Sequence, residues 1–462
     1  MQPDEPTRGS APLTYGTVLR TWLPLAGSWI LMGLELPMIS AVMARLVDPR
    51  ISLAAYGGVV FPLALIVEAP VIMLLAASTA LAKDEPSYRL LHRFMVVVGA
   101  GLTAIHLAIA ATPLYDLVVA GLIGAPEEIR GPARIGMLLM TPWTWTIAYR
   151  RLQQGVLIRY ERSHQVGIGT VVRLASNATV LAIGVLLGSL PGIAVGTAAV
   201  AAGVSAEAYY SYRAVRPILR NRLPLQPRVD PPLTLSRFLH FYIPLAMTSL
   251  LTLLSLPIGS AAVSRMPRAI DSLAVWPVLN GLTFTMRSLG LAFNEVVVAL
   301  LDRTGAARVL RRFAWLMSGA TSGTLLLIAA TPLAGLYFSG ISGLPPELAL
   351  LAGQGLWISV WMPALGFQQH LRQGVLVHVH RTRAITEAVA VYLLTSASVL
   401  AAGILLDRFT GLFVALIGTV VGNAAQVGWL WFRSRPVFAD LTRASGSAPL
   451  PARPRLRDLP YR

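Results

Sequence analysis

The sequence predicts an all-α polytopic membrane protein in which twelve transmembrane helices form two pseudo-symmetric six-helix bundles. Three observations support this fold class. Of the 462 residues, 55% are hydrophobic and only 13% are charged, and the mean hydropathy of +0.64 is well above that of a water-soluble globule. Apolar stretches long enough to cross a bilayer recur along the whole chain. The second half of the sequence also repeats the first half.

The twelve spans follow from a search for apolar segments, because about 20 apolar residues in a helix cross the hydrocarbon core of a bilayer. Several of the segments are longer than this minimum, so we expect tilted or kinked helices. The predicted spans cover residues 18–44, 53–81, 94–122, 134–158, 166–187, 193–214, 238–264, 273–301, 313–339, 348–377, 385–405 and 411–432.

The repeat is visible in matching stretches about 219 positions apart. LQQGVLIRYERS at 152–163 returns as LRQGVLVHVHRT at 371–382, and PLAGSWILMGLELPMISAVMARL from Pro24 returns as PLAMTSLLTLLSLPIGSAAVSRM from Pro244. Because each copy has an even number of helices, both copies start and end on the same side of the membrane. Parallel repeats of this kind occur in secondary transporters, whose substrate site lies near mid-membrane between the halves.

The repeat divides the chain into five parts. A cytoplasmic N-terminal tail (1–16) precedes the first bundle (17–216), a cytoplasmic linker (217–236) leads to the second bundle (237–435), and a basic tail (436–462) follows. We expect the basic, Pro-rich tail to be disordered. Lys and Arg gather after the even-numbered spans and in this tail, and cytoplasmic loops collect positive charge. We therefore expect a multi-pass protein of the bacterial cytoplasmic membrane with both termini in the cytoplasm.

The formal charge of +17 raises the question of a nucleic-acid partner, but the basic residues follow the membrane topology instead of forming one patch. We expect a monomer whose partners are the lipid bilayer and a small molecule, without nucleic acid.

The chain has no Cys, which excludes disulfides and thiolate ligands. It has no GxxxxGK[ST] loop, which argues against ATP-driven pumping. Ionisable residues are scattered over many spans, so we expect no enzymatic activity and no metal or cofactor.

The candidate functional residues are charged positions at which the two halves differ, because the common scaffold needs only what both halves share. An ionisable group inside a span is costly, so it is usually paired or exposed to a water-filled cavity. These positions, each with its counterpart in the other half, are Glu35 (Ser255), Glu68 (Ser288), His106 (Leu325), Arg173 (Tyr392), Glu207 (Gln426), Arg287 (Val67), Glu295 (Leu75) and Glu387 (Ile168).

Glu35 is a candidate for ion coupling. It lies two residues before Pro37, which removes a backbone donor and tends to kink the helix. The kink leaves backbone carbonyl oxygens without their hydrogen-bond donors, and a carboxylate beside such oxygens can bind H⁺ or Na⁺. A buried ion-paired carboxylate and a wetted helix face are the alternatives.

Glu68, Arg173, Arg287 and Asn294 are the candidate substrate-binding residues. Glu68 and Arg287 occupy almost equivalent positions of the second and eighth spans, so they form a pair between the halves if these helices face each other. Otherwise each is paired within its own bundle or contacts water. Arg287 and Asn294 share one helix face, and Arg173 lies in mid-span. Guanidinium groups match carboxylate or phosphate oxygens, which favours an anionic substrate over the alternative of internal ion pairs.

Several short motifs carry a family resemblance. They are GLEL at Glu35, LAAYG at 53–57, QGVLIRYERSHQVG at 154–167 and P-x6-HL-x2-G at 363–374. The Gly-Asp-Arg-rich loop of major facilitators is missing between the second and third spans. The chain resembles the multidrug and toxin extrusion (MATE-like) group of the superfamily of multidrug, oligosaccharidyl-lipid and polysaccharide (MOP) exporters. Within that superfamily it is most similar to the progressive ankylosis protein family.

This resemblance implies a two-lobed exporter that works by rocking-bundle alternating access, with H⁺ or Na⁺ held by Glu35 and Glu295. The seventh span has no acid, which departs from the pattern of MATE drug exporters. We expect a secondary active exporter of small organic anions or amphiphilic compounds. A flippase for a lipid-linked saccharide or phospholipid-like substrate and an H⁺- or Na⁺-coupled efflux pump for cationic drugs are the alternatives.

Overall fold

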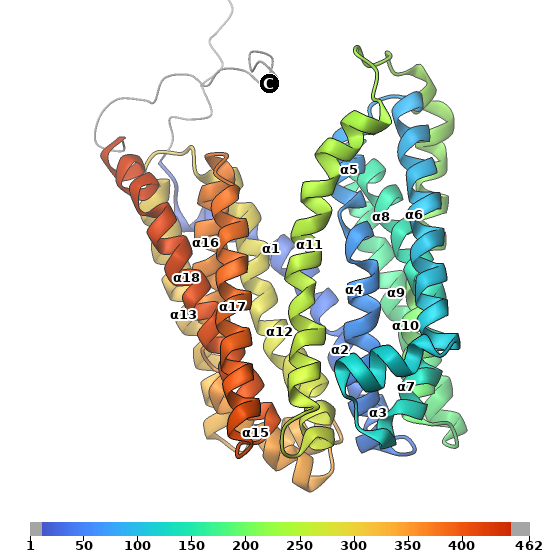
Figure 1. Ribbon diagram of the computed structural model, residues 1–462. Coiled ribbons are helices and arrows are strands. Elements are labelled where there is room, and N and C mark those ends of the chain that lie inside the picture. Colours follow the sequence, from blue (N-terminus) through green and yellow to red (C-terminus); the bar gives the residue numbers. More distant parts are fainter. Residues whose placement is uncertain (1–11, 445–462) are drawn as a thin grey trace, which may run out of the picture.

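The computed structural model describes residues 12–444, and this part of the chain is all-helical, without a β-strand. Twelve transmembrane helices form two bundles (Figure 1). In the first bundle they are α1 (Tyr15–Gly33) with α2 (Glu35–Met43); α3 (Pro49–Ala55), η1 (Tyr56–Val60), α4 (Phe61–Ile72) and α5 (Leu74–Leu81) in sequence; α6 (Glu85–Ala111); α7 (Glu127–Leu139) with α8 (Thr141–Arg159); α9 (Ser163–Leu187); and α10 (Gly192–Asn221).

The second bundle repeats this order. Its helices are α11 (Leu235–Val263), α12 (Ala269–Leu300), α13 (Ala306–Ala330), α15 (Pro346–Ser359) with α16 (Met362–His378), α17 (Arg383–Leu406) and α18 (Gly411–Ala444). Short helices connect the long ones: η2 (Asp116–Ile123), η3 (Leu223–Leu225), α14 (Leu333–Gly335) and η4 (Leu336–Ile341).

The third and ninth helices end earlier than the apolar pattern predicts. The spans 94–122 and 313–339 both contain the sequence AATP, at which α6 ends at Ala111 and α13 ends at Ala330. Thr112 and Thr331 adopt extended backbone, because the residue before a proline disfavours the helical conformation. The apolar residues that follow form η2 and η4.

The C-terminal tail also differs from its prediction. α18 continues to Ala444, so residues 436–444 are helical, whereas we predicted disorder from 436 onward. The rest of that tail, 445–462, and residues 1–11 of the N-terminal tail lie outside the described residues.

Ten helices of the described part are long and apolar enough to cross a membrane by length and composition. The two spans beyond these ten are α7 with α8, and α12. Both carry polar side chains in mid-sequence, such as Arg150 and Gln154 in α8 and Arg287 in α12. The fourth and eighth helices are thus more polar than the other ten, and both place charged side chains inside the bundles.

The two halves repeat in backbone conformation as well as in sequence. Positions with positive φ recur at the same offset, in the pairs Asp48 and Arg268, Gly124 and Gly343, Glu161 and His380, and Gly188 and Asp407. The shared QG motif has a packing reason. A Cβ at Gly155 would lie 1.7 Å from Ser78 Oγ, and one at Gly374 would lie 2.7 Å from Val297 Cβ. Only glycine lets α8 and α16 approach their neighbours this closely.

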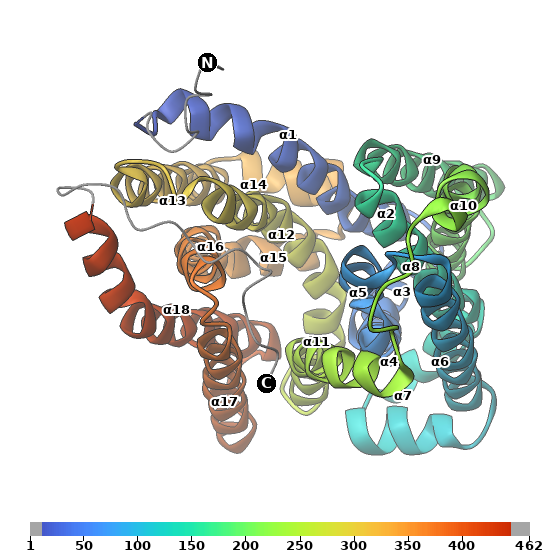
Figure 2. The same ribbon diagram turned by 90° about the horizontal axis from the view of Figure 1, so that it is seen from above.

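The first helix of each half crosses to the opposite bundle. Val18 and Trp22 of α1 are buried in one hydrophobic cluster with Phe293 and Phe313 of the second bundle. In return, the first turns of α11 pack on the first bundle, where the Tyr242 hydroxyl donates to the Pro70 carbonyl oxygen. Figure 2 shows α1 passing over α12 and α13 before it reaches α2, and α11 reaching α4 on the other side of the molecule.

Two reciprocal arginine contacts join the bundles at the end that lies opposite Tyr15 and Ala444, which we call the far end. Arg45 Nη2 donates to the Gly340 carbonyl oxygen of η4 at 2.5 Å. Arg265 occupies the equivalent position in the other half, and it donates to the carbonyl oxygens of Ile123 (2.7 Å) and Leu122 (2.9 Å) of η2. Each arginine thus binds the carboxyl end of the short helix in the other bundle. The ribbons of the bundles meet at this end and lie apart at the end that carries Tyr15, the terminal end (Figure 1).

The double variant Arg45→Ala/Arg265→Ala is predicted to loosen the far end. Hydrogen bonds of this kind contribute roughly 0.5–1.5 kcal/mol each, so the ratio of open to closed far ends should rise on the order of tenfold or more. The chain has no Cys, so spin labels can be attached at Leu117→Cys and Leu350→Cys, two exposed positions in different bundles. Double electron–electron resonance then measures the distance between the two labels. Arg89→Ala, which removes an exposed ion pair within α6, serves as the control. Equal distance distributions for both variants would contradict the prediction.

Candidate functional site

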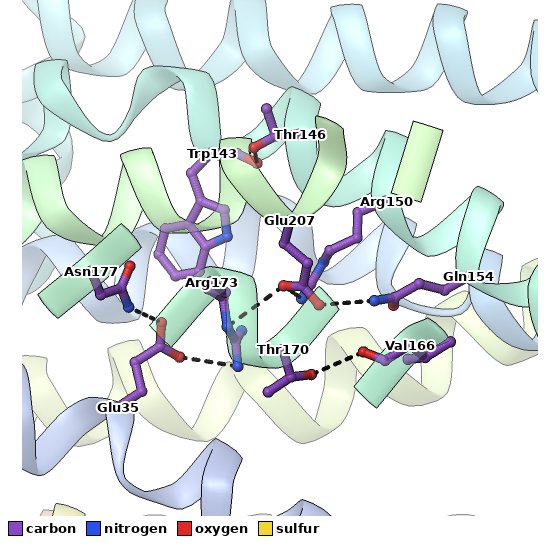
Figure 3. A network of polar contacts seen from close by, with 10 residues as sticks. All are labelled: Glu35, Trp143, Thr146, Arg150, Gln154, Val166, Thr170, Arg173, Asn177 and Glu207. Carbon is purple, nitrogen blue, oxygen red and sulfur yellow. Dashed lines mark hydrogen bonds and ion pairs between the residues drawn. The ribbon is translucent and has the colours of Figure 1, made fainter. Parts of the chain in front are cut away.

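A cluster of charged side chains lies inside the first bundle, and Glu207 of α10 is its centre (Figure 3). The Glu207 side chain is fully buried. Arg150 of α8 donates from Nη1 to Glu207 Oε2, and Gln154 Nε2 donates to Glu207 Oε1 at 2.9 Å. Arg173 of α9 adds a third contact, with its Nε 3.5 Å from Glu207 Oε2. A fully buried carboxylate is stable only with such partners, so Glu207 ties three helices together.

Arg173 continues this network to Glu35. Its Nη2 lies 3.4 Å from Glu35 Oε2, and Asn177 Nδ2 donates to Glu35 Oε1 at 2.7 Å. Glu35 is the more accessible end, because 19% of its side-chain surface is exposed compared with 7% for Arg173. Figure 3 shows Arg173 between the two carboxylates.

The position of Glu35 follows from a break in the first transmembrane helix. α1 ends at Gly33 and α2 begins at Glu35. Pro37 has no N–H, so the Gly33 carbonyl oxygen loses its helical donor. The hydroxyl of Thr285 of α12 lies 3.2 Å from the Gly33 oxygen and shares its proton with the Gly281 carbonyl oxygen, which is 2.9 Å away. The break is therefore stabilised by the second bundle, while the carboxylate beside it is held by the first.

Glu68 of α4 belongs to the same cluster. It is 4% exposed and lies within electrostatic range of Arg151, Arg150 and Arg173, although within residues 12–444 it has no ion pair closer than 4.0 Å. Three carboxylates and three guanidinium groups therefore share the interior of the first bundle, and their charges balance.

The equivalent region of the second bundle has a different composition. Arg287 of α12 is half-buried beside His370 of α16 and Tyr392 of α17. In the described part of the chain no carboxylate lies within 4.0 Å of Arg287. His370 Nδ1 and Asn294 Oδ1 are buried without a hydrogen-bond partner there. The second bundle thus keeps Arg287 among neutral polar groups. Arg372 of α16 is also half-buried there, and its Nη1 donates to Gln368.

The repeat explains this difference position by position. At the common offset, His370 takes the place of Arg151, Tyr392 that of Arg173, and Gln426 that of Glu207. The acids of the first bundle have neutral counterparts, whereas Arg287 has been added next to the position that matches Glu68. A cation without a counterion in this setting is costly unless an anion or water compensates it.

The structure brings only some of the predicted residues together. Glu35, Glu68 and Arg173 lie in one cluster, but Glu68 and Arg287 form no pair, because each faces the interior of its own bundle. Asn294 lies two turns beyond Arg287 on α12. Glu295 is exposed on α12, where it faces Trp29 of α1, so it is separate from the Glu35 cluster.

Four residues of these two clusters are not among the predicted site residues. Arg150 and Arg151 lie within the predicted span 134–158, but we grouped them with the basic loop that follows. Glu207 is among the charged positions at which the halves differ, with Gln426 as its counterpart, but we assigned it no role. His370 had no signal of its own beyond its place in a resemblance motif. Within residues 12–444, no group of three or more His, Asp or Glu side chains is arranged to hold a metal ion.

No protein-family model matches the sequence, and a search of curated proteins gave no match. Solved structures do match. An inward-facing multidrug resistance MATE family transporter of the MOP superfamily aligns with a TM-score of 0.71 and 14% identity over 93% of this chain and 99% of that chain. The lipid II flippase MurJ in an inward closed conformation aligns with a TM-score of 0.69 and 13% identity over 92% and 90% of the two chains.

An outward-facing structure of a MATE family transporter of the MOP superfamily aligns less well, with a TM-score of 0.61 and 14% identity over 94% of this chain and 100% of that chain. At these identities the likeness concerns the fold alone, and the specific resemblance to the progressive ankylosis family stays a prediction. The chain therefore has the two-lobe, twelve-helix fold of the MATE transporters.

Proposed function

We propose that this protein is a secondary active transporter that exports small organic anions, or amphiphilic compounds with an anionic group, by alternating access between the two bundles. The observation that carries the proposal is Arg287. It is a half-buried guanidinium group, and the described chain provides no carboxylate partner for it. An anionic substrate would supply the missing counterion.

The arrangement of the bundles supports alternating access. The contacts of Arg45 and Arg265 lie at the far end, whereas α1 and α11 bridge the bundles elsewhere. The better alignment with the inward-facing than with the outward-facing MATE structure agrees with an opening at the terminal end. In the predicted orientation that end faces the cytoplasm.

Arg287 belongs to α12, which also packs against α1, α2 and α3. Its helix therefore takes part in the contact between the bundles, so the affinity for a substrate bound at Arg287 would depend on the relative orientation of the bundles. Arg173 is less suited to bind substrate, because Glu35 and Glu207 already compensate its charge.

Glu35 is our candidate for ion coupling. Its carboxylate is partly accessible, lies at the break between α1 and α2, and has only Asn177 and Arg173 as polar partners in the described chain. Protonation or Na⁺ binding would weaken the contact with Arg173. Glu295 remains a second candidate, at a distance from this cluster.

A lipid-linked substrate is the second candidate function, and the likeness to MurJ favours it. MurJ is a lipid II flippase by name, and lipid-linked saccharides carry phosphate groups that would also match Arg287. Fluorescent lipid-linked saccharides in proteoliposomes distinguish this function from the export of soluble anions.

Arg287→Gln is predicted to lower anion transport in proteoliposomes on the order of tenfold or more, because a charge-assisted contact is worth about 1.5–3 kcal/mol. The assay measures labelled citrate, nucleotides and cationic dyes under imposed pH or Na⁺ gradients. Arg287→Lys keeps the charge and should retain part of the activity. Undiminished anion flux in the Gln variant, or transport of cationic dyes alone, would reject the anion hypothesis.

Glu35 and Glu207 are predicted to respond differently to neutralisation. Glu207→Gln leaves two buried arginines without their shared carboxylate and should destabilise the protein by about 3–5 kcal/mol. Glu35→Gln should keep the fold and abolish the dependence of transport on the ion gradient. Thermal unfolding of the purified variants in detergent, together with flux measurements, checks both. Coupling that persists in Glu35→Gln would rule out its proposed role.

A further inference from the structure

A basic cavity lies at the terminal end of the second bundle, apart from the residues proposed for transport. Its volume is about 660 Å³, and it lies between the ends of α16, α17 and α18. Figure 1 shows α18 leaning away from α16 and α17 toward this end. Four of the residues that line it are arginines: Arg381, Arg383, Arg433 and Arg435.

The charge of this cavity is only partly compensated. Glu387 of α17 is 3.2 Å from Arg433 Nε and 3.6 Å from Arg383 Nε. Arg381 and Arg435 have no carboxylate within 4.0 Å among the residues that the structure describes. With four guanidinium groups and one carboxylate, the cavity is strongly positive.

The remaining wall of the cavity is apolar. Phe432 and Pro436 of α18 contribute to it, and Phe432 is 61% exposed on the surface of the bundle. The Arg435 guanidinium lies 5.4 Å from the centre of the Trp431 ring, and Trp431 is itself half exposed. Exposed aromatic side chains beside arginines are typical of the level at which a helix leaves the hydrocarbon core for the headgroups.

We infer that this cavity binds the headgroup phosphate of an anionic phospholipid from the leaflet at the terminal end, with an acyl chain along the apolar surface of α18. Basic pockets between transmembrane helices are suited to anionic headgroups, and guanidinium groups bind phosphate oxygens in pairs. The inference is independent of the proposed transport function, because it concerns the lipid-facing side of α17 and α18.

The C-terminal segment of the chain is not a better occupant. The segment that follows α18 carries Arg453, Arg455, Arg457 and Arg462 against the single acid Asp458, so it has the same sign of charge as the cavity. Inorganic phosphate shares the headgroup chemistry but would leave the apolar wall without a partner.

The first bundle provides a matched control. Arg216 of α10 is the counterpart of Arg435 at the offset of 219, and Arg213 lies one turn before it. The Arg216 guanidinium lies 5.3 Å from the centre of the Tyr212 ring, much as Arg435 lies beside Trp431. Removing these two arginines subtracts the same charge from the same end of the molecule without touching the cavity.

The test measures lipid binding by native mass spectrometry of the full-length protein, titrated with phosphatidylglycerol or phosphatidylcholine. Arg381→Ala/Arg435→Ala should weaken phosphatidylglycerol binding on the order of tenfold, since each basic residue near an anionic surface contributes about fivefold. Arg213→Ala/Arg216→Ala should change it by less than about threefold. Arg381→Lys/Arg435→Lys keeps the charge and should restore most of the binding.

Three outcomes would overturn the inference. Phosphatidylcholine binding as tightly as phosphatidylglycerol would exclude recognition of the anionic headgroup. Equal losses of phosphatidylglycerol binding in both double-alanine variants would indicate attraction by the overall positive charge of this end instead of a specific site. Full displacement of the lipid by inorganic phosphate at similar concentration would identify a site for free phosphate.

Discussion

The reciprocal contacts of Arg45 and Arg265 are the constraint on which the arrangement of the two bundles depends. Each arginine lies in the turn that follows the first transmembrane helix of one half, and it donates to backbone carbonyls at the end of a short helix in the other half. Carbonyls at a helix end lack partners within the helix and carry partial negative charge, so a guanidinium group suits them. Since both contacts lie at the far end, the bundles are fixed there and diverge toward the termini.

The two bundles differ in the polar side chains that their interiors contain. The first bundle contains balanced charges that hold one another in place, with Glu207 fully buried at the centre. The second bundle contains neutral polar groups around Arg287. A duplicated scaffold allows this division, because one copy can keep a fixed polar interior while the other changes its side chains.

Much of the fold could be predicted from the sequence, because apolar length and the repeat are strong signals. The AATP motif ended two helices earlier than hydropathy indicated, since a proline acts on the backbone of the residue before it whatever the apolar content. The crossing of α1 and α11 was not predictable, because a repeat defines equivalent positions and not the bundle on which a helix packs.

The site was only partly predictable for a related reason. Equivalence of the second and eighth helices suggested that Glu68 and Arg287 meet, but pseudo-symmetry places equivalent residues at the same location in separate bundles. Both side chains therefore point into their own bundle. Arg150 and Arg151 were missed because charge near the end of a span looks like loop charge in sequence, although helix α8 buries Arg150 beside Glu207.

The break between α1 and α2 links a carboxylate to the geometry of the whole molecule. Trp22 anchors the first part of this helix in the core of the second bundle, and Asn177 holds Glu35 in the first. If one bundle rotates relative to the other, either the backbone at Leu34 has to bend or the contact made by Trp22 or by Asn177 has to break. By thermodynamic reciprocity, an ion that changes how firmly Glu35 is held also changes how freely the lobes turn.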